Sequence, residues 1–164
     1  MRKFAYGIAA VSVALASPAF AGTAQNDMPV SVNVLNSCTV AATPMAFGSP
    51  TQIGGADIDS TSTITLTCTT GAAYEVALDT GGNSASGQRY MAGTGSNTDT
   101  IPYNIYRDSG RSQTWGANSG SDTVSGTAAS GSAFTLTAYG QIPSSAAAVV
   151  ADNYTDTVTV TVTF

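Results

Sequence analysis

The side chains that most often carry enzyme chemistry are scarce in this chain. It has no histidine, which excludes a Ser-His-Asp triad and histidine metal ligands. Asp57 and Asp59 are close enough in sequence to suggest a glycosidase carboxylate pair or part of a calcium loop. They follow Gly54-Gly55, as in an ordinary loop, and lack the glycine and glutamate that a calcium loop requires at fixed positions. We therefore expect a non-enzymatic protein with no catalytic residues, no metal site and no cofactor.

A set of aromatic residues is the other candidate for binding chemistry: Tyr103, Tyr106, Trp115, Tyr139 and Tyr154. Exposed together, these rings would form a platform for carbohydrate. Buried separately, they would fill a core and direct their polar tips to hydrogen-bond partners, which is the usual arrangement. We favour the second interpretation.

The charge of the chain excludes another class of partner. Charged residues make up only 9% of the sequence, and five basic residues face ten acidic ones, for a net charge of −5. Nucleic-acid-binding proteins normally carry a basic patch. Disordered charged tails require a charge density that is missing here. We expect no nucleic-acid partner.

Residues 1–21 have the organisation of a secretory signal peptide. Arg2 and Lys3 precede an uncharged run over residues 4–16, and Ala19 and Ala21 form an A-x-A cleavage site. The run is too short to cross a bilayer comfortably. No later segment is long and apolar enough, so we expect export without membrane insertion.

The two cysteines of the chain are Cys38 and Cys68. An exported protein meets an oxidising compartment, where an even number of cysteines indicates disulfide formation. Both residues lie in segments that read as strands. We therefore predict one structural disulfide that links two strands near the start of the domain.

The elements that must position these residues are strands. Apolar and polar residues alternate with period two over residues 28–34, 64–68, 74–78, 134–138 and 154–164. Clusters of Gly, Asn, Asp and Ser separate these runs. The pattern predicts an all-β sandwich or barrel.

The last alternating run places four apolar residues on one face, where we expect them to point into the core: Val158, Val160, Val162 and Phe164. No residue follows Phe164 to cover this strand, although monomeric proteins usually protect a long apolar edge. Two interpretations remain open. The first and last strands close the sandwich within one chain, or the fold lacks a strand that a neighbour's N-terminus supplies.

Several motifs occur in an order that resembles the spore coat protein U domain family. They are Cys38-Thr39-Val40, Phe47-Gly48, Ile64–Cys68, Tyr103–Asp108, Trp115-Gly116, Tyr139–Pro143 and Tyr154–Phe164. The resemblance covers about residues 38–164. The family includes the rod subunits of archaic chaperone–usher pili, which this chain resembles in size.

This resemblance implies an incomplete immunoglobulin-like sandwich that lacks its last strand and is completed by a donor strand from another subunit. Residues 22–37 would then be an N-terminal extension, overlapping in part with the first strand of a domain over residues 38–164. The implied donor residues alternate along the extension: Met28, Val30, Val32 and Val34. Val158, Val160, Val162 and Phe164 would line the acceptor groove.

The same resemblance implies the partners and the location of the protein. A periplasmic chaperone and an outer-membrane usher would handle the subunit before it joins a homopolymeric fimbrium at the cell surface, which would support adhesion and biofilm formation. Two alternatives remain: a pilus tip adhesin, or a secreted coat-type protein that folds as a complete monomer.

Overall fold

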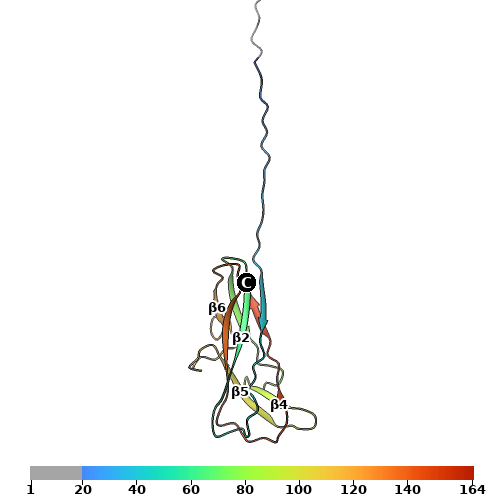
Figure 1. The fold of residues 1–164 in the computed structure, drawn as a ribbon, viewed down its shortest axis with the longest axis vertical. Helices are drawn as coiled ribbons and strands as arrows, with labels where there is room; N and C mark the ends of the chain where they lie inside the picture. The colour runs from blue at the N-terminus through green and yellow to red at the C-terminus, as the bar shows by residue number, and fades with distance from the viewer. Residues whose placement is uncertain (1–19) are drawn as a thin grey trace, which may run out of the picture. The chain divides into compact units, whose positions relative to one another are not determined.

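The computed structural model describes residues 20–164 (Figure 1). The predicted signal peptide, residues 1–21, lies outside the described residues except for Phe20 and Ala21. Residues 34–164 form one compact unit, and the description of the fold concerns this unit. Within residues 20–164 there is no helix long and apolar enough to span a membrane.

Every regular element in residues 20–164 is a β-strand, which confirms the predicted all-β class. The strands are β1 (Cys38–Ala42), β2 (Ile58–Cys68), β3 (Ala73–Leu78), β4 (Arg89–Gly93), β5 (Thr100–Tyr106), β6 (Val124–Thr127), β7 (Phe134–Ile142), β8 (Tyr154–Thr155) and β9 (Val160–Thr163).

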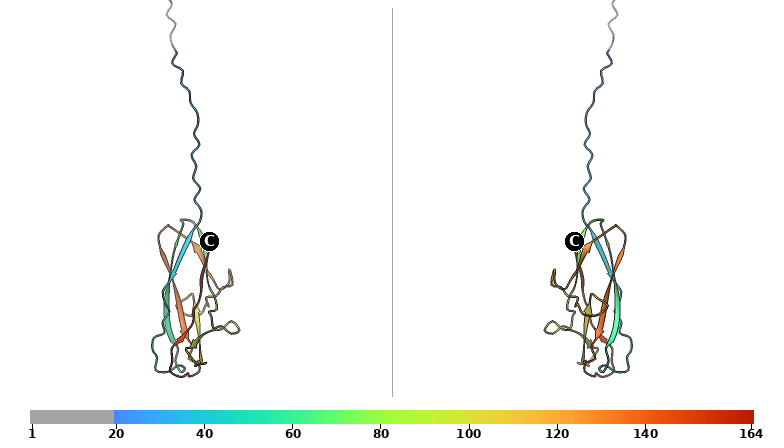
Figure 2. Two further views of the ribbon diagram at one scale, coloured as in Figure 1. Left: turned by 90° about the vertical axis from the view of Figure 1, so that its right-hand side faces the viewer. Right: turned by 90° about the vertical axis from the view of Figure 1, so that its left-hand side faces the viewer.

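The strands form two antiparallel sheets. The larger sheet has the order β1-β2-β7-β5-β4-β8, and the smaller one has the order β6-β3-β9. The long strands β2 and β7 pair from Ile58↔Ile142 to Leu66↔Phe134, and they lie side by side in both turned views (Figure 2). The alternation predicted for residues 64–68 continues along β2, where Ser62, Ile64, Leu66 and Cys68 are buried.

The core lies between the two sheets. β2 contributes Ile64 and Leu66, β3 contributes Val76 and Leu78, and Trp115 is 1% exposed. The Trp115 indole Nε1 donates to the Val76 carbonyl over 2.9 Å. This residue is therefore a core aromatic with a bonded polar tip, as we favoured from the sequence.

The disulfide between Cys38 and Cys68 is present and confirms the prediction. These two residues are direct partners in the antiparallel register of β1 and β2. The bond therefore links adjacent strands at the end of the domain where β1 begins and β2 ends.

The alternating run over residues 154–164 does not form one strand, and the last strand predicted from Val158 to Phe164 is assigned only over Val160–Thr163. The segment is split into β8, which pairs with β4 in the larger sheet, and β9, which pairs with β3 in the smaller one. Residues 156–159 carry the chain from one sheet to the other. An alternating sequence cannot reveal such a crossover, because both halves keep the same period.

Residues 30–37 belong to no strand, and the first strand of the domain begins at Cys38. The first strand thus begins at the residue predicted to start the domain, and the bounds of the extension stay a prediction. Residues 20–33, taken by themselves, form no regular element and are exposed.

Candidate functional site: an open groove between the sheets

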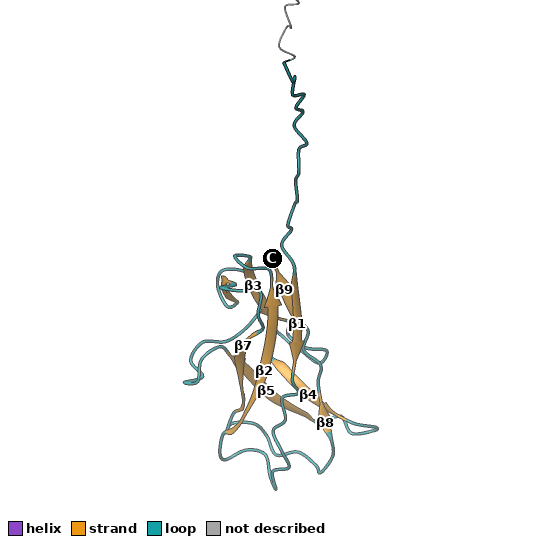
Figure 3. Ribbon diagram, turned by 45° about the horizontal axis from the view of Figure 1, so that its top comes forward, coloured by secondary structure: helices purple, strands orange, loops and turns teal. Residues whose placement is uncertain are grey.

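Two strand edges without a partner border the site. Among the strands of residues 20–164, β1 pairs only with β2, and β9 pairs only with β3. The two edges lie near each other, one from each sheet (Figure 3). A closed sandwich would need a further strand to pair with these free backbone groups.

The inner side of β1 is left uncovered at this edge. Val40 and Ala42 have the same parity as Cys38 and pair with Leu66 and Ile64, which are fully buried on β2. Nevertheless Val40 is 41% exposed, and Ala42 is exposed as well. The core is therefore filled beneath β2 and open beneath β1.

A cavity of about 550 Å³ continues from this opening into the sandwich. Its walls are mostly apolar and come from both sheets and from the loop after β1. The lining residues are Ala42, Thr43, Pro44, Met45, Phe47, Ser62, Ile64, Leu78, Met91, Tyr103, Ile105, Ala138, Tyr154, Thr155, Asp156, Thr157, Val158 and Val160. The volume is within the range of pockets that bury a ligand.

The four residues predicted for the acceptor groove have different positions along its length. Val158 and Val160 line the cavity, and Val162 packs against the core from its pair with Val76. Phe164 is outside the cavity lining and is 53% exposed. The structure thus brings Val158 and Val160 to one deep site and leaves Phe164 at the disulfide end of β9.

A carboxylate fixes the crossover at the deep end of the groove. Asp156 Oδ2 accepts a hydrogen bond of 2.6 Å from the Tyr103 hydroxyl. Its Oδ1 accepts from the backbone amides of Gly82 and Asn83, at 2.9 and 3.2 Å. Gly81 has a φ of +80°, and a Cβ there would collide with this carboxylate. Burial, followed by the bond to Asp156, raises the pKa of Tyr103 above its ordinary value.

A second carboxylate holds the start of β9. Asp79 Oδ1 accepts from the amide of Thr159 at 2.8 Å and from Gly81 at 3.0 Å. Burial would raise the pKa of Asp79, but these hydrogen bonds together with the nearby Arg89 charge lower it. Asp79 and Asp156 thus attach the crossover to the turn that follows β3.

Arg89, the first residue of β4, stabilises the end of β3 beside this turn. It is 8% exposed, and its Nη2 donates to the carbonyls of Leu78, Asp79 and Trp115 over 3.1, 2.6 and 2.9 Å. Burial lowers the pKa of this guanidinium. Since the bonds go to backbone carbonyls, Arg89 holds the end of β3 in place and has a structural role.

Some residues that line the cavity could not be predicted from the sequence. Met45 and Phe47 belong to the loop after β1, and Met91 belongs to β4. The only signal was the Phe47-Gly48 motif within the family resemblance, because no periodicity marks a loop residue as inward-facing.

The predicted donor residues are exposed in the described chain. Met28, Val30 and Val32 are 83%, 85% and 88% exposed, and Val34 is 73% exposed. Single exposed apolar residues are ordinary, but an uncovered series of them is typical of a binding segment. They form no strand within their own segment.

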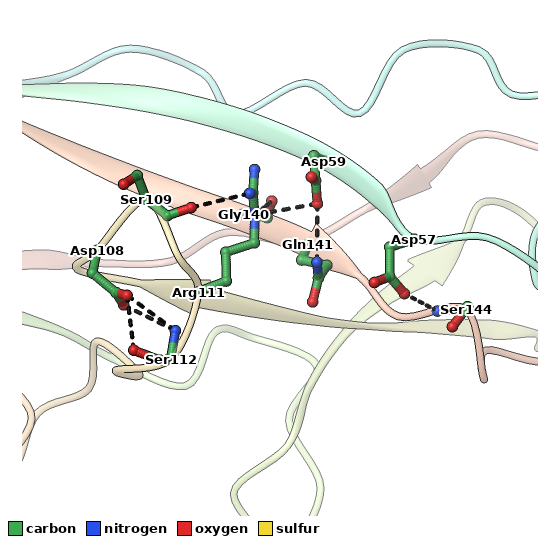
Figure 4. Close-up of polar contacts among 9 residues, drawn as sticks. All are labelled: Asp57, Asp59, Asp108, Ser109, Arg111, Ser112, Gly140, Gln141 and Ser144. Atoms are coloured by element: carbon green, nitrogen blue, oxygen red, sulfur yellow. Dashed lines mark hydrogen bonds and ion pairs between the residues drawn. The ribbon is translucent and has the colours of Figure 1, made fainter.

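The candidate carboxylate pair does not form a joint site (Figure 4). Asp57 accepts from the Ser144 amide at 2.6 Å, whereas Asp59 accepts from Gln141 at 3.1 Å and pairs with Arg111 at 3.2 Å. Asp57, just before β2, thus contacts the residues after β7, whereas Asp59 on β2 contacts β7 and the loop after β5. Within residues 20–164, no group of three or more metal-ligating side chains is present.

Comparisons with solved structures give the fold. A chain of the CsuC–CsuE chaperone–tip adhesion subunit pre-assembly complex, from archaic chaperone–usher Csu pili of Acinetobacter baumannii, is similar with a TM-score of 0.56 and 21% identity. The match covers 80% of this chain and 40% of that one, so this chain matches less than half of the neighbour's length. The fold is thus the immunoglobulin-like type expected from the sequence.

A chain from a chaperone–tip adhesin complex of CFA/I fimbriae aligns over 70% of this chain and 37% of its own length. Its identity is 17% and its TM-score is 0.34, too low to indicate a common fold. No curated protein matches this sequence.

A comparison of the sequence with protein-family models identifies the family. The model of the Spore Coat Protein U domain matches residues 24–161, which include all nine strands except the last two residues of β9. The resemblance inferred from separate motifs thus extends over most of the chain. This protein belongs to the Spore Coat Protein U domain family.

Proposed function

We propose that this protein is a structural subunit of a surface pilus and that it polymerises without covalent bonds by donor-strand complementation. Residues 22–37 are the N-terminal extension, and Met28, Val30, Val32 and Val34 of one copy enter the groove of the next. The groove is bordered by Val158, Val160, Val162 and Phe164. The observation that carries this proposal is the open cavity beside the free edges of β1 and β9.

The physical fit supports this occupant. A strand between β1 and β9 would pair with free backbone groups on both sides, and its alternate side chains would enter the apolar cavity. Four apolar side chains contribute roughly 1.5–3 kcal/mol each when fully buried, before the entropy cost of ordering the segment. The extension has such a series and no strand partner of its own.

The proposal includes the partners that the family resemblance implied. A periplasmic chaperone lends a strand to the groove while the subunit folds, and an outer-membrane usher exchanges that strand for the next subunit's extension. The similar solved chain comes from a chaperone–subunit complex. The product is a fimbrium on the cell surface, where it supports adhesion and biofilm formation.

Deletion of the extension tests the proposal. Mature protein without residues 22–34 is expected to stay monomeric, whereas a control without residues 22–27 keeps all four apolar donor residues and polymerises. The readout is a ladder on SDS gels that collapses to a single band only on boiling. Ladders from the longer deletion would refute the donor assignment. A stable monomer from the intact protein would instead favour a coat-type protein that completes its own sandwich.

A further inference from the structure

Antiparallel pairing continues one residue beyond the disulfide. After the Cys38–Cys68 pair, the amide of Thr69 donates to the Ser37 carbonyl over 2.8 Å. In the opposite direction the Ser37 amide donates to the Thr69 side-chain Oγ1 over 3.1 Å. The Thr69 hydroxyl thus takes the place of a backbone carbonyl, and Ser37 continues the line of β1.

The same hydroxyl also reaches Leu35. Its oxygen is 3.3 Å from the Leu35 carbonyl and 3.5 Å from the Ser37 carbonyl. A hydroxyl has one proton to donate, and the Ser37 carbonyl is already bonded to the Thr69 amide. The proton is therefore best placed toward Leu35. We name Thr69 with its contacts to Leu35 and Ser37 the exit clamp.

We infer that the exit clamp disfavours filling of the groove by the extension of the same chain and so favours its entry into the groove of another copy. This inference rests on the proposed function, because it concerns the same groove and the same donor residues. It adds a structural determinant, the contacts of Thr69, that decides whether the extension enters its own groove or that of another copy.

Which residues of the extension reach the groove of their own chain depends on where the chain turns back before β1. With no clamp, a two-residue turn at Leu35-Asn36 would pair Asn33 with Cys38 and bring residues 28–32 beside residues 39–43. The apolar donor residues would then lie along β1, at the entrance to the groove of their own chain.

With the clamp in place, residues 35–37 are held in line with β1, and the last possible turn is at Asn33-Val34. Pro29 would then lie beside Cys38, and residues 25–27 would lie beside residues 40–42. Val30 and Val32 would remain beyond the end of the domain. The groove would thus receive Gln25, Asn26 and Asp27, polar residues that do not suit an apolar cavity.

The test compares three variants of the mature full-length chain. Thr69→Val removes the hydroxyl and keeps the β-branched shape, and Thr69→Ser restores a hydroxyl. Thr39→Val is the matched control, because it removes an exposed hydroxyl on β1 that bonds only the Thr67 carbonyl. The readouts are the monomer-to-polymer ratio and the amide hydrogen exchange of residues 28–34 in the monomer fraction.

We expect Thr69→Val to raise the monomer-to-polymer ratio at least about fivefold, since fivefold is the effect of losing one exposed hydrogen bond and this variant loses two. We also expect it to protect the amides of residues 28–34 in the monomer. Thr69→Ser and Thr39→Val should match the wild type. Equal ratios and unprotected amides in Thr69→Val would overturn the clamp. If the wild type forms no polymer, the proposed function fails, and amide protection alone decides whether the clamp disfavours self-filling.

Discussion

The hydroxyl of Tyr103 makes a hydrogen bond between two residues that line the cavity, Tyr103 and Asp156. Tyr103 is 4% exposed, and its hydrogen bond to Asp156 connects β5 of the larger sheet to the crossover that leads into β9. This bond is partly buried, and a hydrogen bond to a carboxylate contributes more than one between neutral groups. This residue therefore couples the shape of the cavity to the position of the last strand.

Tyr103→Phe is expected to destabilise the domain by about 1.5–3 kcal/mol, the range for a hydrogen bond to a charged group. The measurement is urea unfolding of the monomeric mature protein without residues 22–34. Tyr90→Phe is the control, because Tyr90 is a partly buried residue of β4 whose hydroxyl makes no hydrogen bond within residues 20–164. Equal stability of the two variants would mean that the Tyr103–Asp156 bond contributes nothing.

The titration of Glu75 yields a second prediction at this scale. Hydrogen bonds from Thr123, Gly120 and Ser119 lower the pKa of this carboxyl from its ordinary value of 4.5. A carboxyl whose pKa is lower in the folded state stabilises the fold above its unfolded pKa, and this contribution is lost as the pH falls through the folded pKa.

Glu75→Gln is therefore expected to lower stability at pH 7 and to lower it less at pH 3, because the contribution of Glu75 decreases as the pH falls below its unfolded pKa and through its lower folded pKa. Urea unfolding of both proteins at the two pH values gives the comparison. A stability difference that stays constant between pH 7 and pH 3 would show that the folded state does not favour the ionised form.

Among the strands, β1 depends on a covalent bond as well as on its hydrogen bonds. It has five residues, pairs on one side only and leaves its inner face open. Reduction of the disulfide is expected to destabilise the domain by about 3–4 kcal/mol in the chain-entropy model, for a separation of 30 residues. Urea unfolding with and without a reductant measures this. The chain has only these two cysteines, so the reductant acts at one bond.

Two adjacent residues of β9 make it possible to distinguish an effect on binding in the groove from an effect on the stability of the strand. Val160 lines the cavity, whereas Thr161 is exposed on the opposite face. Val160→Asp is expected to reduce binding of a synthetic peptide of residues 22–37 by at least tenfold, because it places a charge where apolar side chains enter. Thr161→Asp should bind as the wild type does. Fluorescence anisotropy with the monomeric deletion variant measures both, and equal affinities would refute the groove assignment.

The elements also show how far sequence reasoning reaches. The strands β2, β3 and β7 could be predicted because their alternation reflects one buried face, as at Leu66 and Val76. The break between β8 and β9 could not, because it depends on where Asp79 and Asp156 attach the chain. The same alternation placed Val158 and Val160 on the face that lines the cavity. The position of Met45 could not be predicted, because it depends on how the loop after β1 folds.

For the whole molecule, the extension and the groove are different surfaces of one chain. A contact between them is heterologous, and a heterologous contact that does not close into a ring repeats as an open filament. Size-exclusion chromatography with light scattering at increasing concentrations is expected to give a broad series of masses at integer multiples of the mature chain. A single closed oligomer at all concentrations would contradict the filament.

The position of the disulfide has a mechanical consequence. A pull on the residues before Cys38 enters the domain at the first residue of β1, where the bond to Cys68 transfers it to the end of β2. β2 is eleven residues long and has a paired neighbour on both sides. Tension therefore passes from a short edge strand to a long central one through a covalent bond, and β1 cannot be peeled away before β2 carries the load.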